Sequence, residues 1–189
     1  MNLLQPAEDH LDGYLAALRR GWSANTMATP DLIREELERI EADPVGVLAA
    51  MDDREAKGPP IRLPDGTLAK RLPGFRRWLW DGEFCGSIGL RWQPGTTDLP
   101  PHCLGHIGYA VVPWKRGRGY ATTALRLLLP EAWSLGLPFV ELTTDRDNLP
   151  SQRVIEANAG VLVERFTLPT EFGATPSLRY RIFRPGGDR

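Results

Sequence analysis

The residues with the clearest chemical potential form a basic turn that contains two glycines. Three cations, Lys115, Arg116 and Arg118, alternate with Gly117 and Gly119. Glycine lets the backbone curl so that successive N–H groups face one point, where they can bind an anion. The turn therefore predicts a site for a phosphate or diphosphate. The alternative is a surface turn whose cations are only solvated.

A strand before this turn and a helix after it must hold it in place. In residues 104–112, Ile107, Tyr109 and Val111 alternate with small residues, as in a strand that is buried on both faces. From Ala121 onward, apolar residues recur with the spacing of one helix face. The helix begins directly at the turn, so its free amides and the positive end of its dipole strengthen the predicted anion site.

Composition limits the classes of protein that the chain can belong to. Its 189 residues suit one domain with a sizeable core, and a net charge of −1 gives no field for nucleic acid or a membrane surface. Cys85 and Cys103 lack metal-ligand spacing, so we expect no metal and a reducing, cytoplasmic setting. No apolar run approaches the roughly 20 residues of a membrane span. The first residues lack the basic and apolar regions of a secretory signal.

The order of predicted elements indicates an α+β (α/β/α) fold. We expect one domain over residues 1–189, with a helical part over 1–58, a core over 75–183 and a disordered tail over 185–189. The core begins with a hairpin that turns at Asp81-Gly82. A strand–helix–strand unit, a short helix and two last strands follow. They predict a mixed, mostly antiparallel sheet of six or seven strands, with one parallel strand–helix–strand unit at its centre.

Several local features accompany this order. Thr29 and Pro30 form a helix-start signal, and Pro44 is expected to open a helix that reaches about Lys57. Residues 64–67 read as a turn, and Pro130 should kink or fray the long helix. Ligands of parallel strands bind beyond the carboxyl ends of the strands, so residues 112–119 and 144–151 should border one crevice.

Two motifs in this order resemble those of the GNAT superfamily of acyl-CoA-dependent N-acetyltransferases. The phosphate motif of the family stands in full as Arg116-Gly117-Arg118-Gly119-Tyr120-Ala121, and a second motif stands as Asn148-Leu149-Pro150-Ser151. The run His106-Ile107-Gly108-Tyr109 resembles the Glu-Ile-Gly-Tyr run of the family's central strand. The resemblance covers residues 75–183 and favours a branch of predicted acetyltransferases with an extended helical N-terminus.

The resemblance implies that acetyl-CoA binds in the crevice, with its diphosphate on the basic turn and its pantetheine along exposed backbone of the central strand. It assigns to the coenzyme Val111, Val112, Arg116, Gly117, Arg118, Gly119, Tyr120, Ala121, Thr122, Asn148 and Ser151. The implied reaction moves the acetyl group to a primary amine of a small molecule or peptide by direct attack. The alternative is a non-catalytic acyl-CoA-binding sensor or regulatory module. The last strands of such folds often pair between subunits, so a homodimer is a further expectation.

Acetyl transfer needs a neutral amine, so a proton acceptor is expected. Deprotonating a lysine-like amine at pH 7 costs ~4.6 kcal/mol, whereas an α-amino group with a pKa of about 7.7–8.0 needs far less help. His106 stands where many relatives carry a Glu and is the first candidate for the base. The alternative is a hydrogen-bonded structural histidine. His102 is a weaker candidate.

The other catalytic roles are assigned less directly. The family often places a Tyr that acts as general acid in the last helix. Ile155 stands at that position here, so Ser151 is the candidate for contact with the coenzyme sulfur. Helix capping is the alternative role of Ser151 and of Asn148. The oxyanion is expected at a backbone N–H near Val112. The acceptor pocket is expected between residues 21–29 and 93–103, with Trp22, Trp80, Trp92 and His102 either in its lining or in the core.

Overall fold

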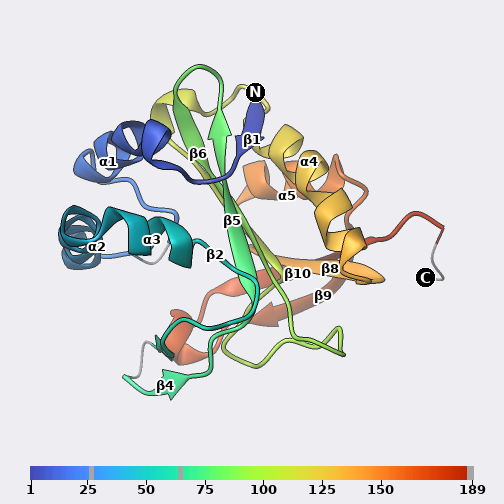
Figure 1. The fold of residues 1–189 in the computed structure, drawn as a ribbon. Helices are drawn as coiled ribbons and strands as arrows, with labels where there is room; N and C mark the ends of the chain where they lie inside the picture. Colours follow the sequence, from blue (N-terminus) through green and yellow to red (C-terminus); the bar gives the residue numbers. More distant parts are fainter. Residues whose placement is uncertain (26–27, 64–65, 187–189) are drawn as a thin grey trace.

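The computed structural model describes residues 1–25, 28–63 and 66–186, and it places their strands in two sheets and a small hairpin (Figure 1). The larger sheet contains β1 (Asn2–Leu4), β5 (Gly74–Trp80), β6 (Phe84–Arg91) and β7 (Ile107–Val111) in that spatial order, and β2 (Asp52–Asp53) also pairs with β5. The second sheet has the order β8 (Phe139–Asp145), β10 (Pro176–Phe183) and β9 (Val161–Thr167). A short hairpin joins β3 (Ile61–Arg62) to β4 (Leu68–Ala69).

Helices lie on both faces of the larger sheet. The N-terminal part holds η1 (Glu8–His10), α1 (Leu11–Arg19), α2 (Pro30–Ala42) and α3 (Pro44–Ala50). The rest holds η2 (Pro113–Lys115), α4 (Tyr120–Ser134), α5 (Leu149–Glu156) and η3 (Thr170–Phe172). The helix start at Thr29 is confirmed, because its side chain accepts a hydrogen bond from the Leu32 amide and Pro30 is the first helical residue.

The predicted mixed, mostly antiparallel architecture is confirmed, but its strands are divided between two sheets. All pairings within each sheet are antiparallel. The helix that begins at Pro44 ends at Ala50 rather than near Lys57, and α4 continues past Pro130 to Ser134. Two of the predicted turn residues, 64 and 65, and residues 187–189 of the predicted tail lie outside the described residues.

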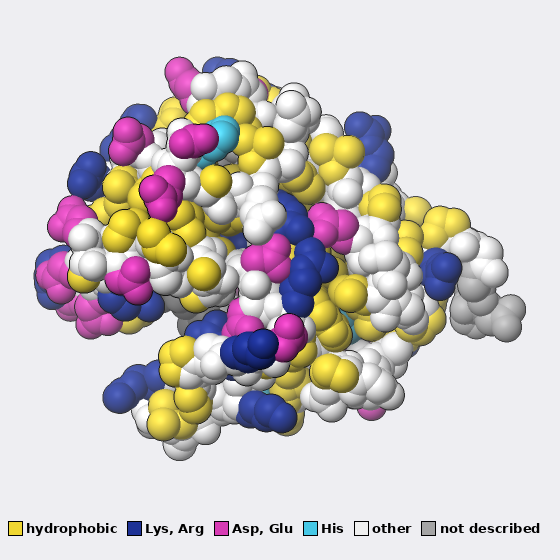
Figure 2. Space-filling model, viewed as in Figure 1, with side chains coloured by type: hydrophobic (Ala, Val, Ile, Leu, Met, Phe, Trp, Pro, Cys, Tyr) yellow, Lys and Arg dark blue, Asp and Glu magenta, His cyan; other side chains and the backbone are white. Residues whose placement is uncertain are grey.

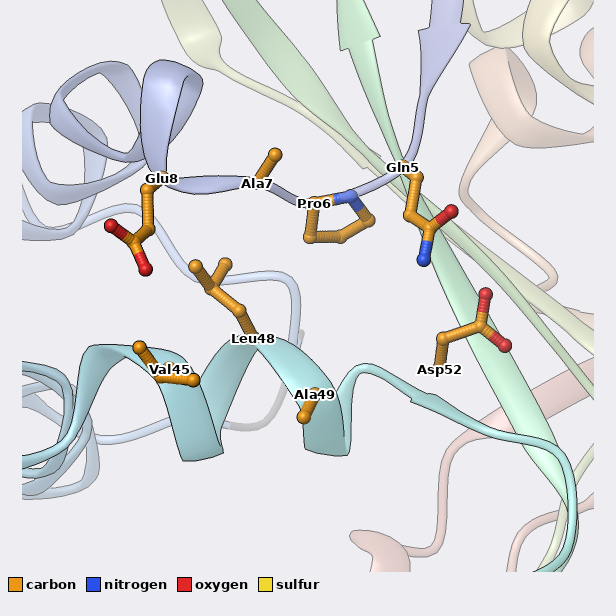
Figure 3. A pocket seen from close by; sticks show the side chains of 8 residues that line it. All are labelled: Gln5, Pro6, Ala7, Glu8, Val45, Leu48, Ala49 and Asp52. Carbon is orange, nitrogen blue, oxygen red and sulfur yellow. The ribbon is translucent and has the colours of Figure 1, made fainter.

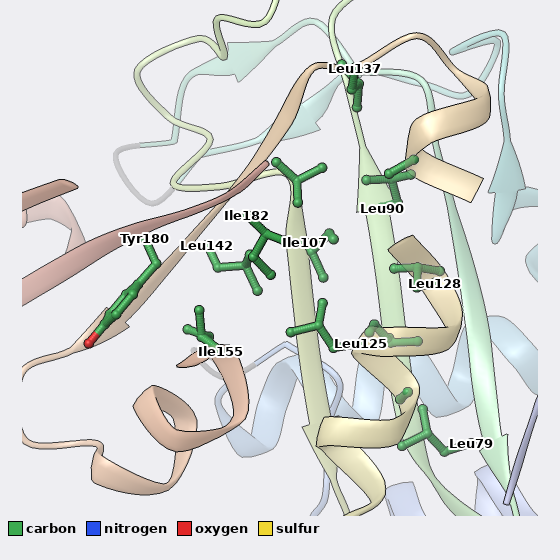
Figure 4. Close-up of a cluster of buried hydrophobic side chains, with 14 of the residues drawn as sticks. Leu79, Leu90, Ile107, Leu125, Leu128, Leu137, Leu142, Ile155, Tyr180 and Ile182 are labelled. Carbon is green, nitrogen blue, oxygen red and sulfur yellow. The ribbon is translucent and has the colours of Figure 1, made fainter. Parts of the chain in front are cut away.

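The main core lies between α4 and the two sheets. Leu125 and Leu128 of α4 are fully buried, and Figure 4 shows them pointing toward the strands that carry Leu90 and Ile107. Strand β8 and strand β10 add further apolar residues to the same cluster. Burial of this one face fixes α4, and with it the turn at the start of α4, against the sheets.

A second core lies on the opposite face of the larger sheet, under α1 and α2. Tyr14 of α1 stacks on Trp78 of β5 with 5.0 Å between ring centroids, and Phe84 of β6 packs edge-on against Trp78. Figure 2 shows acidic and basic side chains intermixed over the outer surface of these helices. Among the described residues, no helix is long and apolar enough to span a bilayer.

The contrast between two neighbouring leucines of α4 tests this packing. We expect Leu128→Ala to lower the free energy of unfolding by about 2–5 kcal/mol, because the fully buried side chain leaves a cavity. Leu127→Ala is the matched control on the same helix, since Leu127 is 44% exposed and should cost far less. Urea unfolding followed by circular dichroism measures both. Equal losses for the two variants would contradict the assigned orientation of α4.

Candidate active site

The two sheets touch at one end of β7 and β8 and separate from there. The His106 amide donates to the carbonyl of Glu141 at 2.8 Å, and the Glu141 amide donates to Nδ1 of His106 at 3.0 Å. Beyond this contact β7 and β8 are not neighbours in either sheet. An imidazole nitrogen thus replaces a strand carbonyl as the partner of a buried amide, which lets the two strands part without leaving that amide unpaired.

The edge of β7 that faces the opening carries free backbone positions. The Val112 amide donates to the carbonyl of Cys85 in β6 at 3.0 Å. Bonding alternates along an antiparallel pair, so the N–H and C=O groups of Tyr109 and Val111 point away from β6, toward the opening. The oxyanion was expected at a backbone N–H near Val112, and the Val112 amide itself already has a strand partner. The amide that faces the opening at this level is that of Val111.

The basic turn forms an open cradle at the start of α4. Gly117 and Gly119 have φ of +75° and +73°, and a Cβ atom added to either would have no atom within 4 Å. The first bond of the helix runs from the Thr123 amide to the carbonyl of Gly119, so the amides of residues 120–122 have no partner within the helix. No described side chain caps this end. Free amides, left-handed glycines and open space are the features that an anion site requires.

The cations of the turn are not equivalent. The ammonium group of Lys115 lies 3.0 Å from a carboxylate oxygen of Asp81 and 3.1 Å from one of Glu83. Tyr120 also donates its hydroxyl to Asp81, and these two donors hold the pKa of the Asp81 carboxyl well below its usual range. Lys115 is thus neutralised by the β5–β6 turn. The cations left for a ligand are the exposed Arg116 and Arg118.

Arg116 also bonds to the edge of β7 that faces the opening. Its Nε donates to the carbonyl of Val111 at 3.2 Å. One of the backbone groups that pantetheine was expected to use is therefore already bonded to the protein. The Val111 amide and both backbone groups of Tyr109 keep their direction toward the opening.

The second sequence motif lies at the start of α5, across the opening from β7. The side-chain oxygen of Asn148 accepts from the Ser151 amide at 3.2 Å, which is the capping role named as an alternative. The Ser151 hydroxyl lies 2.7 Å from the hydroxyl of Tyr109. Burial raises the pKa of Tyr109 to about 12, so this hydroxyl stays protonated. Ile155 is buried in the main core.

Sequence reasoning noted Tyr109 only as a strand residue and did not name Asp81 among the site residues. A partial signal existed for Tyr109, since it follows the Ile-Gly pair of the resembling run. For Asp81 the sequence held no signal beyond a hairpin turn. Both residues become functional candidates only through contacts 39 and 42 positions away along the chain.

His106 is fully buried on the joint between the sheets. Its burial lowers its pKa below the usual 6.5, and the guanidinium groups of Arg91 and Arg181 act in the same direction while Glu141 opposes them. Because Nδ1 accepts a hydrogen bond, the proton of the neutral ring belongs on Nε2, which has no partner among the described residues. These contacts are those of the structural histidine named as the alternative. Its role as base stays a prediction.

The aromatic residues expected around the acceptor are engaged in packing. Trp22 is 5% exposed and packs on Phe84, and Trp80 packs edge-on against His10. Trp92 packs against Phe75. Each therefore takes the core role that was the alternative.

A surface hollow of about 420 Å³ lies elsewhere, between the segment after β1 and helix α3 (Figure 3). It is lined by Gln5, Pro6, Ala7, Glu8, Val45, Leu48, Ala49 and Asp52. None of these residues belongs to the cradle or to the opening between β7 and β8. Among the described residues, no group of three or more histidine, cysteine or acidic side chains is arranged to hold a metal ion.

Comparisons with known proteins identify what this geometry is similar to. A family model described as "Acetyltransferase (GNAT) domain" matches residues 2–160. RimJ of Mycobacterium smegmatis, solved in complex with CoA-disulfide, is 16% identical with a TM-score of 0.65, over 96% of this chain and 80% of that chain. The microcin C7 self-immunity acetyltransferase MccE, in complex with acetyl-CoA and AMP, is 14% identical with a TM-score of 0.60, over 96% and 91%.

A third solved structure is the spermidine N-acetyltransferase SpeG of Vibrio cholerae. It is 13% identical with a TM-score of 0.58, over 97% of this chain and 95% of that chain. At such identities the likeness of the solved structures shows the fold alone. A search of curated proteins found no match.

The lowered pKa of His106 predicts a pH-dependent stability. Below about pH 6.5 the unfolded chain takes up a proton that the folded ring resists, so the free energy of unfolding should fall as the pH decreases. His106→Gln keeps a neutral acceptor for the Glu141 amide but cannot titrate. Urea unfolding between about pH 5 and pH 7.5 should give a steeper loss for the native protein than for the variant. Parallel curves would show that the ring is not buried in its neutral form.

Proposed function

Because the chain belongs to the acetyltransferase (GNAT) family, we propose that it moves an acetyl group from acetyl-CoA to a primary amine of a small molecule or peptide. The single observation that carries this proposal is the open cradle of residues 117–122, which adjoins the opening between β7 and β8. A diphosphate fits free amides and two exposed guanidinium groups, since each charge-assisted hydrogen bond contributes about 1.5–3 kcal/mol.

The coenzyme is proposed to lie along the opening. The amides of Gly117, Gly119, Tyr120, Ala121 and Thr122 hold the diphosphate together with the side chains of Arg116 and Arg118. The backbone of Tyr109 and Val111 pairs with pantetheine, since these are the strand groups that face away from β6. The thioester supplies an activated acetyl group at the level of Val111 and Ser151.

The proposed chemistry is direct attack. The amine nitrogen bonds to the thioester carbonyl carbon, the carbon–sulfur bond breaks, and the amine loses a proton while the leaving thiolate gains one. The Val111 amide is placed to donate to the developing oxyanion. Ser151 donates toward the sulfur, and the protonated Tyr109 hydroxyl bonded to it can resupply the proton.

His106, the first candidate for the base, has no exposed surface. An acceptor with an α-amino group needs little help from a base, because its pKa of about 7.7–8.0 leaves an appreciable neutral fraction near neutral pH. We therefore favour an α-amino acceptor over a lysine-like amine.

The buried His106 also favours a second candidate function, a non-catalytic acyl-CoA-binding sensor. Thiol release from acetyl-CoA with a panel of amines separates the two functions. Release that depends on the amine supports the transferase. Acetyl-CoA binding without turnover by any amine supports the sensor and would overturn the transferase.

The cradle is tested by adding a side chain and a negative charge to it. Gly119→Glu should reduce acetyl-CoA binding below detection, because the carboxylate occupies and repels the diphosphate position. Gly136→Glu is the matched control, since Gly136 has φ of +81° and equally open surroundings at the far end of α4. Calorimetric titration measures both variants. Undiminished affinity in Gly119→Glu would rule out the cradle as the coenzyme site.

The proton donor is tested on the hydroxyl pair. Ser151→Ala should lower kcat on the order of 100-fold with little change in the KM for acetyl-CoA, and Tyr109→Phe should lower kcat by less, because it acts through Ser151. Ser134→Ala at the end of α4 is the control, since its hydroxyl bonds only a helix carbonyl. Initial rates of thiol release provide the measurement. An unchanged kcat in Ser151→Ala would remove Ser151 from the reaction.

A further inference from the structure

The β6–β7 side of the larger sheet carries a patch without side chains. Gly89 of β6 and Gly108 of β7 are directly opposite each other in the strand register, and Arg76 of β5 is opposite Gly89 on the other side. Gly108 is exposed although it lies within strand β7 and follows the buried Ile107. We call Gly89 and Gly108, with the arginines that border them, the glycine patch. A bare stretch of sheet backbone in this position leaves room for a ligand to lie against the strands.

The patch lies on the face of the sheet that α1 and α2 cover only in part. Ile107 and Val111 of β7 pack in the core under α4, while Ala110 and Val112 pack in the core under α1 and α2. Side chains alternate along a strand, so Gly108 belongs to the second face. The coenzyme cradle begins at α4, which covers the first face. The patch thus lies on the face of the larger sheet opposite to the face that α4 covers.

A guanidinium group lies over the patch. A Cβ atom added to Gly108 would stand 3.2 Å from Nη2 of Arg91. Arg91 follows Gly89 by two residues in β6, so the two lie on the same face of the sheet. The backbone amide of Arg91 donates to the carbonyl of His106 at 2.9 Å, which anchors the base of this side chain beside the joint of the two sheets. Within the described part of the chain the Arg91 guanidinium has no hydrogen-bond or ion-pair partner.

Two carboxylates that share a neighbouring side chain with the bordering arginines are hydrogen-bonded to other groups. Glu36 of α2 accepts a hydrogen bond from the hydroxyl of Tyr14, and the guanidinium group of Arg76 lies near the same hydroxyl. On the other border, Glu141 accepts from Arg181 at 2.9 Å. The positive charge of Arg91 at the patch is not paired with any described carboxylate. An anionic group of a ligand would meet Arg91 directly and Arg76 at the opposite border.

We propose that the glycine patch is the acceptor subsite and that it binds a carboxylate of the acceptor through Arg91. This proposal rests on the proposed function. Gly108 and Val111 are three strand residues apart, about 10 Å, so the amine and the carboxylate must be separated by a comparable length. An α-amino acid, with both groups on one carbon, is too short. A peptide N-terminus followed closely by an acidic side chain fits.

This acceptor class agrees with the rest of the site. Its α-amino group needs little base catalysis, and His106, whose carbonyl accepts from the Arg91 amide beside the patch, is buried. A polyamine would place cations against Arg91, so spermidine should be a poor acceptor. The proposed specificity is therefore for the N-terminus of an acidic peptide.

The experiment compares two peptide amides that differ only in a side-chain carboxylate or carboxamide. Ser-Asp-Ala-amide and Ser-Asn-Ala-amide have closely similar α-amino groups, and serine, spermidine and Ser-Lys-Ala-amide complete the panel. Acetyl transfer is followed by thiol release, and peptide binding by NMR titration of the full-length protein with acetyl-CoA present. We expect kcat/KM for the Asp peptide to exceed that for the Asn peptide by about tenfold or more, as a charge-assisted bond implies.

Three variants assign this preference to the patch. Arg91→Gln should abolish the Asp-over-Asn preference by raising KM for the Asp peptide. Arg91→Lys should restore part of it. Arg126→Gln is the charge-matched control, since Arg126 is exposed on α4, which covers the other face, and it should keep the full preference.

The outcomes separate this proposal from the proposed function. Transfer to neutral or cationic amines without an effect of Arg91→Gln would overturn the carboxylate subsite and leave the transferase standing. Arg91-dependent binding of the Asp peptide without any turnover would support the subsite and overturn the transferase. Equal binding of both peptides without turnover would overturn both. A preference for free serine over the Asp peptide would overturn the length requirement.

Discussion

One hydrogen bond, from the Glu141 amide to Nδ1 of His106, decides the shape of the site. Two strands that separate must leave amides without partners, and a buried unpaired amide is costly. The imidazole ring supplies an acceptor at the place where the strand backbone turns away. The opening between β7 and β8, the exposed edge of β7 and the position of α5 across from it all follow from that separation. Nδ1 can accept this hydrogen bond only while it carries no proton. Burial favours the neutral ring and therefore keeps the acceptor available.

The larger sheet separates the cradle from the glycine patch. On the side of α4, free amides and the guanidinium groups of Arg116 and Arg118 surround the cradle. On the side of α1 and α2, the glycine patch lies under Arg91. Under the proposed function, the donor and the acceptor of the acetyl group approach the edge of β7 from opposite faces. The reacting atoms then meet only at the opening, where strand backbone rather than side chains borders them.

The sequence predicted those parts of the site that depend on local rules. The phosphate turn, the helix start at Thr29 and the hairpin around Asp81 are readable because neighbouring residues determine them. Contacts between distant segments were not readable. The pairing of His106 with Glu141, of Tyr109 with Ser151 and of Lys115 with Asp81 each depends on how the sheets are placed. For that reason the sequence alone provided no basis for these contacts of the candidate cation, acid and base. The single-domain boundaries and the homodimer stay predictions.

The bonds of Asp81 have a consequence for how this protein can vary. Asp81 lies in the tight turn between β5 and β6, yet it fixes Lys115 and Tyr120 on either side of the cradle. Short hairpin turns are ordinarily the places where a chain tolerates insertions and exchanges of residues. Here the turn is bonded to the residues that flank the cradle, so its length and chemistry are constrained together with that loop. An engineer who grafts a tag or epitope onto this molecule should leave this hairpin unaltered.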